Sequence, residues 1–250
     1  MLRFHSRLLL LVSSVALGGC FSRAMAPPSS LGPVDSAAVL PSAQSGVAAF
    51  AGAHGAVFGP TAGSAALRYR RGLPRSVELE ASGTAFVIAR GDLAVPANRG
   101  IYAGRLGFRY QPASFFSFGA GLGGGFSPAG GAFLGPDVGF TFAYENAYVV
   151  PFIAHRSGIS APVAARLVDL SEGDEPPGSD ISRAVATYGF TARGGLRVPL
   201  GRWRSVTWAL PLNLFVATGM TWLVDGRADE DPDDGNLGFF DVVGGIELLL

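Results

Sequence analysis

The chain has 250 residues, of which 48% are apolar and 15% charged, so disorder is excluded for most of its length. No apolar run outside the N-terminus reaches the roughly 18 residues that a membrane helix needs, and any membrane-crossing segments must therefore be strands. A formal net charge of zero removes the electrostatic signature of nucleic-acid binding, and a single cysteine excludes an internal disulfide and a cysteine-rich zinc site.

The N-terminus is typical of a secreted bacterial protein. Residues 1–20 carry two early arginines, a leucine-led apolar stretch and then small residues, which is the pattern of a secretory signal. The LGGC run at 17–20 resembles the bacterial lipobox, and the resemblance implies cleavage before Cys20, diacylglyceryl transfer to its thiol and acylation of the new amine. The alternative is an ordinary signal peptide cleaved near Ala24 or Ala26.

A low-complexity stretch follows the cysteine. Residues 22–45 are rich in proline, serine and alanine and lack a regular apolar period, which predicts a flexible tether. The expected organisation is a signal peptide over 1–19, an acylated cysteine with its tether over 20–45, and one folded domain over 46–250.

From residue 46 onward, turns separate segments that alternate apolar with small or polar residues. A period of two is the signature of strands with one apolar face. In 184–200, Tyr188 and Phe190 fall on one face while Thr191 and Arg193 fall on the other. The segments are expected at 47–58, 64–71, 76–88, 100–111, 114–126, 133–144, 147–157, 184–200, 206–222 and 237–250. The first is the weakest, because it is small and apolar on both faces, and eight strands is the alternative count.

Alternation alone does not separate a membrane barrel from a soluble one, because exchanging inside and outside gives the same pattern. The connections, however, alternate between short turns and long loops at 89–99, 158–183 and 223–236, as in membrane barrels. Aromatic residues also stand at both ends of the apolar faces, where a bilayer has its two interfaces. They are Tyr69, Tyr110, Phe116, Tyr144, Tyr148 and Trp208 near the short turns, and Tyr102, Phe126 and Trp222 near the long loops.

The C-terminus adds a third feature. Its last residues, GIELLL, resemble the signal that the barrel-assembly machinery reads, with Gly245, Leu248 and Leu250 in the glycine and hydrophobic positions but without the usual terminal aromatic. Together the three features resemble small bacterial outer-membrane barrels as a class. The resemblance implies an all-β fold, an antiparallel transmembrane β-barrel of about ten strands in the outer membrane. It also implies membrane lipid, lipopolysaccharide and the assembly machinery as partners.

If the aromatic face meets lipid, the opposite face points inward and carries charges of both signs. Antiparallel pairing across the turn 72–76 would set Arg70 opposite Glu78 and Arg68 opposite Glu80. We expect an ion-paired plug, because about ten strands enclose little more than their own side chains; a pore lining is the alternative. Glycines at 119, 121, 123 and 125 would leave space for a small-molecule crevice on one wall. The expected inward charges are Arg68, Arg70, Glu78, Glu80, Arg105, Arg109, Asp137, His155, Arg193, Arg197, Asp241 and Glu247.

One expected pair has a catalytic alternative. Pairing across 145–147 would set Asp137 opposite His155 near the outer rim, where an Asp–His pair resembles the water-activating groups of outer-membrane proteases. A structural histidine is the favoured interpretation, since no second carboxylate pair can be placed beside it. No nucleophile motif supports hydrolysis either, because the serine of GGGFSPAG lacks the flanking glycines of a nucleophile elbow. The sequence thus predicts no enzymatic activity and no cofactor.

The long loops are acidic. Asp229, Asp231 and Asp233 alternate as in calcium-binding loops, but Pro232 interrupts them and Gly235 comes one residue late. A solvated acidic loop is the favoured interpretation, and a calcium or magnesium site is the alternative.

The function that these features favour is that of a lipid-anchored outer-membrane barrel with a structural or surface-interaction role. Three classes compete with it: a narrow channel for small solutes, an outer-membrane hydrolase, and a soluble periplasmic lipoprotein barrel that binds an apolar ligand. The sequence names no ligand and no oligomeric state.

Overall fold

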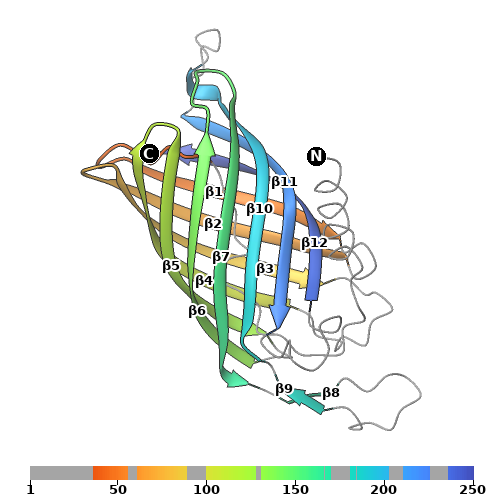
Figure 1. The fold of residues 1–250 in the computed structure, drawn as a ribbon. Helices are drawn as coiled ribbons and strands as arrows, with labels where there is room; N and C mark the ends of the chain where they lie inside the picture. Colours follow the sequence, from red (N-terminus) through yellow and green to blue (C-terminus); the bar gives the residue numbers. More distant parts are fainter. Residues whose placement is uncertain are drawn as a thin grey trace, which may run out of the picture.

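The computed structural model describes residues 36–55, 61–88, 100–127, 131–165, 167–169, 181–183, 185–202, 211–225 and 236–250. Its main feature is a closed antiparallel barrel with the strand order β1-β12-β11-β10-β7-β6-β5-β4-β3-β2 (Figure 1). These strands are β1 (Ser45–Gly55), β2 (Thr61–Leu73), β3 (Val77–Ile88), β4 (Gly100–Ala113), β5 (Phe116–Ser127), β6 (Gly131–Ala143), β7 (Val150–Ala165), β10 (Thr187–Pro199), β11 (Leu212–Asp225) and β12 (Asn236–Leu249). A 3-10 turn, η2 (Leu200–Arg202), follows β10. No helix in the described part of the chain is long and apolar enough to cross a membrane.

The first strand closes the barrel, since β1 pairs with β2 along one edge and with β12 along the other. Val47, for example, lies opposite both Tyr69 on β2 and Leu248 on β12. The predicted ten-stranded antiparallel barrel is confirmed, and the eight-strand alternative is wrong. The alternation of β1 is weak because its inward Ala48 and Phe50 are as apolar as its outward alanines.

The connection expected at 158–183 is partly regular structure. β7 continues to Ala165, and the short strands β8 (Leu167–Asp169) and β9 (Ile181–Arg183) pair with each other beyond the end of the barrel (Figure 1). Alternation does not reveal the end of β7, because Val163, Ala164 and Ala165 are all exposed. The expected loop at 89–99 lies outside the described residues.

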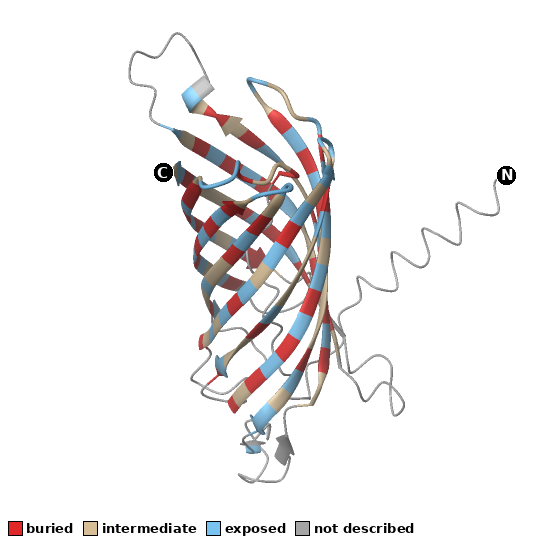
Figure 2. Ribbon diagram, turned by 90° about the vertical axis from the view of Figure 1, so that its left-hand side faces the viewer, coloured by how far each residue is buried: buried red, intermediate tan, exposed pale blue. Residues whose placement is uncertain are grey.

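Burial alternates along the barrel strands, which produces the banding in Figure 2. On β10, Thr187, Thr191 and Arg193 point inward and are buried, whereas Tyr188 points outward and is 58% exposed. The outer wall is apolar, with exposed side chains that include Leu67, Leu106, Val138, Ile153, Val216 and Val242. An apolar outside and a polar inside is the arrangement of membrane barrels and the reverse of soluble ones.

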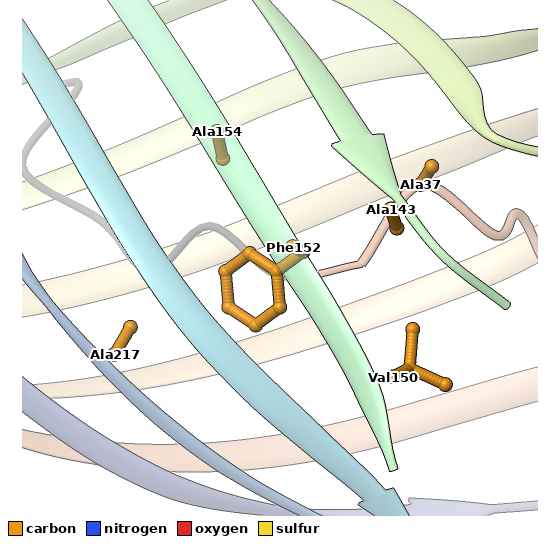
Figure 3. Close-up of a cluster of buried hydrophobic side chains, with 6 residues drawn as sticks. All are labelled: Ala37, Ala143, Val150, Phe152, Ala154 and Ala217. Atoms are coloured by element: carbon orange, nitrogen blue, oxygen red, sulfur yellow. The ribbon is translucent and has the colours of Figure 1, made fainter. Parts of the chain in front are cut away.

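Residues 36–40 lie inside the barrel and 41–44 form an exposed turn at its rim, although the sequence predicts a flexible tether up to residue 45. Ser36, Ala37 and Leu40 are buried, and Ala37 packs against inward-facing Val150 and Phe152 of β7 (Figure 3). The small side chains that suggest a linker also let the segment fit beside inward apolar residues at the short-turn end of the lumen. Low complexity therefore does not make this part of the chain a tether.

A tight turn at residues 41–44, which packs against Gly72 of β2, joins this segment to β1. Ala43 N donates to Gly72 O at 3.0 Å, and Gly72 N donates to Gln44 O at 2.9 Å. A Cβ on Gly72 would lie 2.0 Å from Pro41 O, so the backbone approach requires glycine.

Candidate functional site

The charged residues inside the barrel form the candidate site, and their first group surrounds Arg70. Its Nε donates to Glu247 Oε1 at 2.8 Å, and its Nη1 lies 3.2 Å from Glu78 Oε2. Asn213 Nδ2 donates to Glu247 Oε2 at 2.8 Å, and Arg68 Nη2 lies 3.5 Å from Glu247 Oε1. The two carboxylates have no exposed surface, so each is stabilised by arginine and not by water.

The strand register around this group differs from the predicted one by two residues. Arg70 lies opposite Glu80, and Glu78 lies opposite Gly72. The turn is the three residues 74–76, in which Arg75 and Ser76 have positive φ. A shift of two residues keeps every side chain on its predicted face, and Arg70 still reaches Glu78 diagonally.

A second group surrounds Arg105. Its Nε and Nη2 donate to the two carboxylate oxygens of Asp137 at 2.6 and 2.8 Å, and its Nη1 donates to Glu80 at 2.8 Å. This bidentate fork is the strongest geometry for an arginine–carboxylate pair. A Cβ on Gly121 would lie 2.4 Å from Arg105 Nη2, so this guanidinium fills the space that the glycines on β5 leave. The crevice expected on this wall is therefore occupied by the protein itself.

Arg156 completes the second group and is absent from the predicted set. Its side chain is 7% exposed and lies 3.6 Å from Glu80 and 3.7 Å from Asp137. A cavity of about 20 Å³ remains between it, Arg68, Arg105 and Arg109. That volume is close to what one water molecule needs, so the described side chains fill this level of the lumen.

The end of the lumen opposite the short turns, which we call the outer third, holds a third group, built on Asp241. Arg193 Nη2 donates to Asp241 Oδ2 at 3.0 Å, and Thr221 Oγ1 donates to the same oxygen at 2.6 Å. His54 Nδ1 lies 2.5 Å from Asp241 Oδ1, and His54 Nε2 lies 2.7 Å from Ser64 Oγ. His54 was not predicted, because β1 shows no clear polar face in the sequence.

Two further arginines hold the short-turn end. Arg109 Nη2 donates to Ser36 O at 2.5 Å, and Leu40 N donates to Glu78 Oε2 at 2.8 Å. Arg197 Nη2 donates to Glu145 Oε2 at 2.5 Å. The inserted segment 36–44 is thus bound by the charged residues that line the lumen.

His155 does not belong to the lumen, and its predicted pairing with Asp137 is wrong. It lies opposite Phe140 and faces outward, with ring centroids 5.1 Å from Phe140 and 6.3 Å from Phe190. Asp137 lies opposite Gly158. The connection after β6 is longer than expected, because Asn146 Oδ1 accepts hydrogen bonds from two backbone amides within it. The resulting odd register shift exchanges the two faces of β7, so Arg156 points inward in place of its neighbour.

The other predicted sites are not described. Cys20 and the metal candidates Asp229, Asp231 and Asp233 lie outside the described residues, as does Trp208. Within the described ranges, no group of three or more His, Cys, Asp or Glu side chains could hold a metal ion.

Comparison with known proteins gives only loose likenesses. No protein-family model matches the sequence, and neither does any curated protein. Neisserial surface protein A aligns at 12% identity over 82% of this chain and 95% of its own, with a TM-score of 0.37. A bacterial polysaccharide outer membrane secretin aligns at 9% identity over 86% and 99%, also with a TM-score of 0.37. The siderophore receptor PirA from Pseudomonas aeruginosa aligns at 12% identity over 84% of this chain but 38% of the receptor, with a TM-score of 0.30. At these TM-scores no role or ligand carries over to this chain.

Proposed function

We propose that the chain is a lipid-anchored outer-membrane barrel with a closed lumen, which serves a structural or surface-interaction role. The observation that carries this proposal is the arginine–carboxylate packing inside the barrel. Arg70, Arg105 and Arg193 each bind a carboxylate that is at most 3% exposed. Charges neutralised in this way fill space and do not line a water column.

The outer wall supports insertion in a bilayer. Leu106 and Ile153 are 69% and 66% exposed, which would be unfavourable in water at about 25 cal/mol for each square ångström but is favourable in lipid. The barrel strands have 11 to 16 residues, enough for the roughly 9–11 that a tilted strand needs to cross the hydrocarbon core. Outward Tyr110 near the short turns and Tyr188 near the opposite end stand where interfacial aromatics are expected.

The charged lumen argues against a soluble carrier of apolar ligands. Such a carrier needs an apolar cavity, whereas the described lumen contains buried Arg68, Glu80 and Asp137. The inserted segment 36–44 adds to the closure at the short-turn end, where Leu40 and Ala37 are buried.

Conductance in planar bilayers tests the closed lumen. Purified, folded protein should give little stable conductance. Substitution of Arg105 should affect the stability of the barrel more than any ion selectivity. Large, ion-selective conductance of the native protein would overturn the proposal and favour the narrow channel. Membrane fractionation and a mobility shift on boiling test the outer-membrane location independently of conductance.

A further inference from the structure

We propose that Ser64, His54 and Asp241 form a nucleophilic relay in the outer third of the lumen, which hydrolyses carboxylic esters with an apolar acyl group. This inference goes beyond the proposed structural role and departs from the expectation that the chain is not an enzyme. It rests on three neighbouring strands, β2, β1 and β12, which bring together side chains that lie far apart in the sequence.

The strand register places the three residues in order. His54 lies directly opposite Asp241, and Ser64 lies opposite Gly52, one inward position along β1 from the histidine. His54 Nδ1 is 2.5 Å from Asp241 Oδ1, and His54 Nε2 is 2.7 Å from Ser64 Oγ. A nucleophile bonded to a base whose other nitrogen is held by a carboxylate is the arrangement by which catalytic triads are recognised on unrelated folds.

The surroundings of Asp241 favour one tautomer of neutral His54. Its other oxygen, Oδ2, accepts hydrogen bonds from Arg193 and Thr221, and this favours the ionised carboxylate. An ionised carboxylate can only accept, so in neutral His54 the proton lies on Nδ1 and the lone pair on Nε2 faces Ser64 Oγ. The hydroxyl of Ser64 therefore donates to the base that would remove its proton.

Ser64 is the most accessible of the three residues. Ser64 is partly exposed, whereas His54 and Asp241 are 3% and 0% exposed. On the facing strand, a Cβ on Gly52 would lie 2.8 Å from Ser64 Oγ and 3.2 Å from His54 Nε2, so these two atoms occupy the space that the missing side chain leaves. The inward neighbours of Ser64 on β2 are the small residues Ala62 and Ala66.

One side of the relay is apolar. The ring of Phe86 is 4.9 Å from the ring of His54, and Phe239 is 6.1 Å from Phe86, both buried. Such a lining suits an aliphatic acyl group, and the charged groups deeper in the lumen do not. Esters with apolar acyl chains are therefore the substrate class.

The reaction balances with water as the second reactant. Ser64 Oγ bonds to the acyl carbon as its proton passes to His54 Nε2; the carbon–oxygen bond to the alcohol then breaks, and the alcohol oxygen takes that proton. Water next gives a proton to Nε2 and bonds through its oxygen to the acyl carbon. The bond to Ser64 Oγ breaks, Oγ regains the proton, and the free acid leaves. Asp241 is a positioning residue, because it acts through His54.

A fluorophosphonate probe tests the nucleophile directly on the native protein in detergent micelles. We expect covalent labelling of the folded protein, mapped to Ser64 by mass spectrometry, and loss of labelling after boiling. Ser64→Ala should abolish labelling, whereas Ser82→Ala should leave it unchanged, since Ser82 is a partly buried lumen serine opposite Arg68 and Arg105. Absence of labelling, or equal labelling of folded and boiled protein, would overturn the proposal.

Hydrolysis of p-nitrophenyl butyrate tests the relay. Asp241→Asn should lower kcat by about 10³–10⁴-fold and alter the pH profile, because the amide favours the wrong histidine tautomer. Gly52→Ala would place a Cβ 2.8 Å from Ser64 Oγ, so the hydroxyl has to shift, and the variant should slow both hydrolysis and labelling. If Gly52→Ala left the rates unchanged and Asp241→Asn left the pH profile unchanged, the proposal would be wrong. The three residues would then be only a structural chain of hydrogen bonds. Folding of each variant is checked by its mobility without boiling.

Discussion

Arg70 on β2 and Glu247 on β12 are bonded across β1, with Nη2 2.6 Å from Oε1. The two strands are not neighbours, so this contact ties the beginning of the barrel to its end through the lumen. Both side chains are at most 2% exposed, and neither charge has water to replace a lost partner.

Arg70→Ala should therefore lower the free energy of unfolding by about 3–5 kcal/mol, the usual cost of leaving a buried charge without its partner. Adding Glu247→Ala should recover part of the loss, so the two changes should not be additive. The midpoint of unfolding in urea, followed by gel mobility in lipid vesicles, measures both. Arg75→Ala in the exposed turn is the control and should change stability by less than about 0.5 kcal/mol. Equal effects of Arg70→Ala and Arg75→Ala would contradict the buried network.

Leu106→Arg tests which face meets lipid. Leu106 and Tyr148 are both 69% exposed, but Leu106 lies in mid-strand and Tyr148 in the connection after β6. Arginine at the bilayer midplane costs about 2–4 kcal/mol, and the cost falls to about 0–1 near the interface. In lipid vesicles Leu106→Arg should be clearly less stable than Tyr148→Arg. If the two variants had the same stability, the outer wall would not be in lipid.

Gly72→Ala should dislodge the inserted segment, because the new Cβ would lie 2.0 Å from Pro41 O and 2.4 Å from Leu40 O. We expect faster hydrogen–deuterium exchange at residues 36–44, where Leu40 N now donates to Glu78. Gly83→Ala is the matched control, since a Cβ at Gly83 meets no atom within 4 Å. Unchanged exchange in Gly72→Ala would mean that the segment is not held at this reversal.

Cys20→Ser tests the lipid anchor. The first barrel strand begins at Ser45, so the variant should still fold and still shift in mobility on boiling. Labelled palmitate should be incorporated into the native chain and not into the variant. Incorporation of labelled palmitate into the Cys20→Ser variant would contradict the lipobox assignment.

Alternation of side chains predicts this barrel well, because a closed sheet with an apolar outside repeats the same rule on every strand. On β10, Arg193 and Arg197 lie inward as expected, and so do Thr187 and Thr191. The rule needs only whether a residue stands at an odd or an even position of its strand, which the sequence shows directly. It does not depend on which strands pair with each other.

The register between paired strands cannot be predicted from alternation, because it depends on the length and geometry of the turns. At residues 74–76 the error is even and moves Arg70 to a new partner without changing its face. After β6 the error is odd, so His155 and Arg156 exchange sides. Contacts between strands that are distant in sequence, such as His54 with Asp241, arise only when β1 meets β12 and leave no local signal.

The position of residues 36–44 imposes an order on assembly. The segment continues directly into β1, and β1 is the strand at which the ring closes, from Gly46 opposite Leu249 to Gly55 opposite Phe240. Closing this seam joins the two ends of the domain, a contact of the greatest sequence separation and therefore the slowest to form. If the segment settles on the curved sheet while the seam is still open, zippering of β1 to β12 encloses it. If the seam forms first, residues 36–40 have to enter a finished ring to reach Arg109 and Glu78. Residues 36–44 are thus enclosed only when the last strand of the domain joins the sheet.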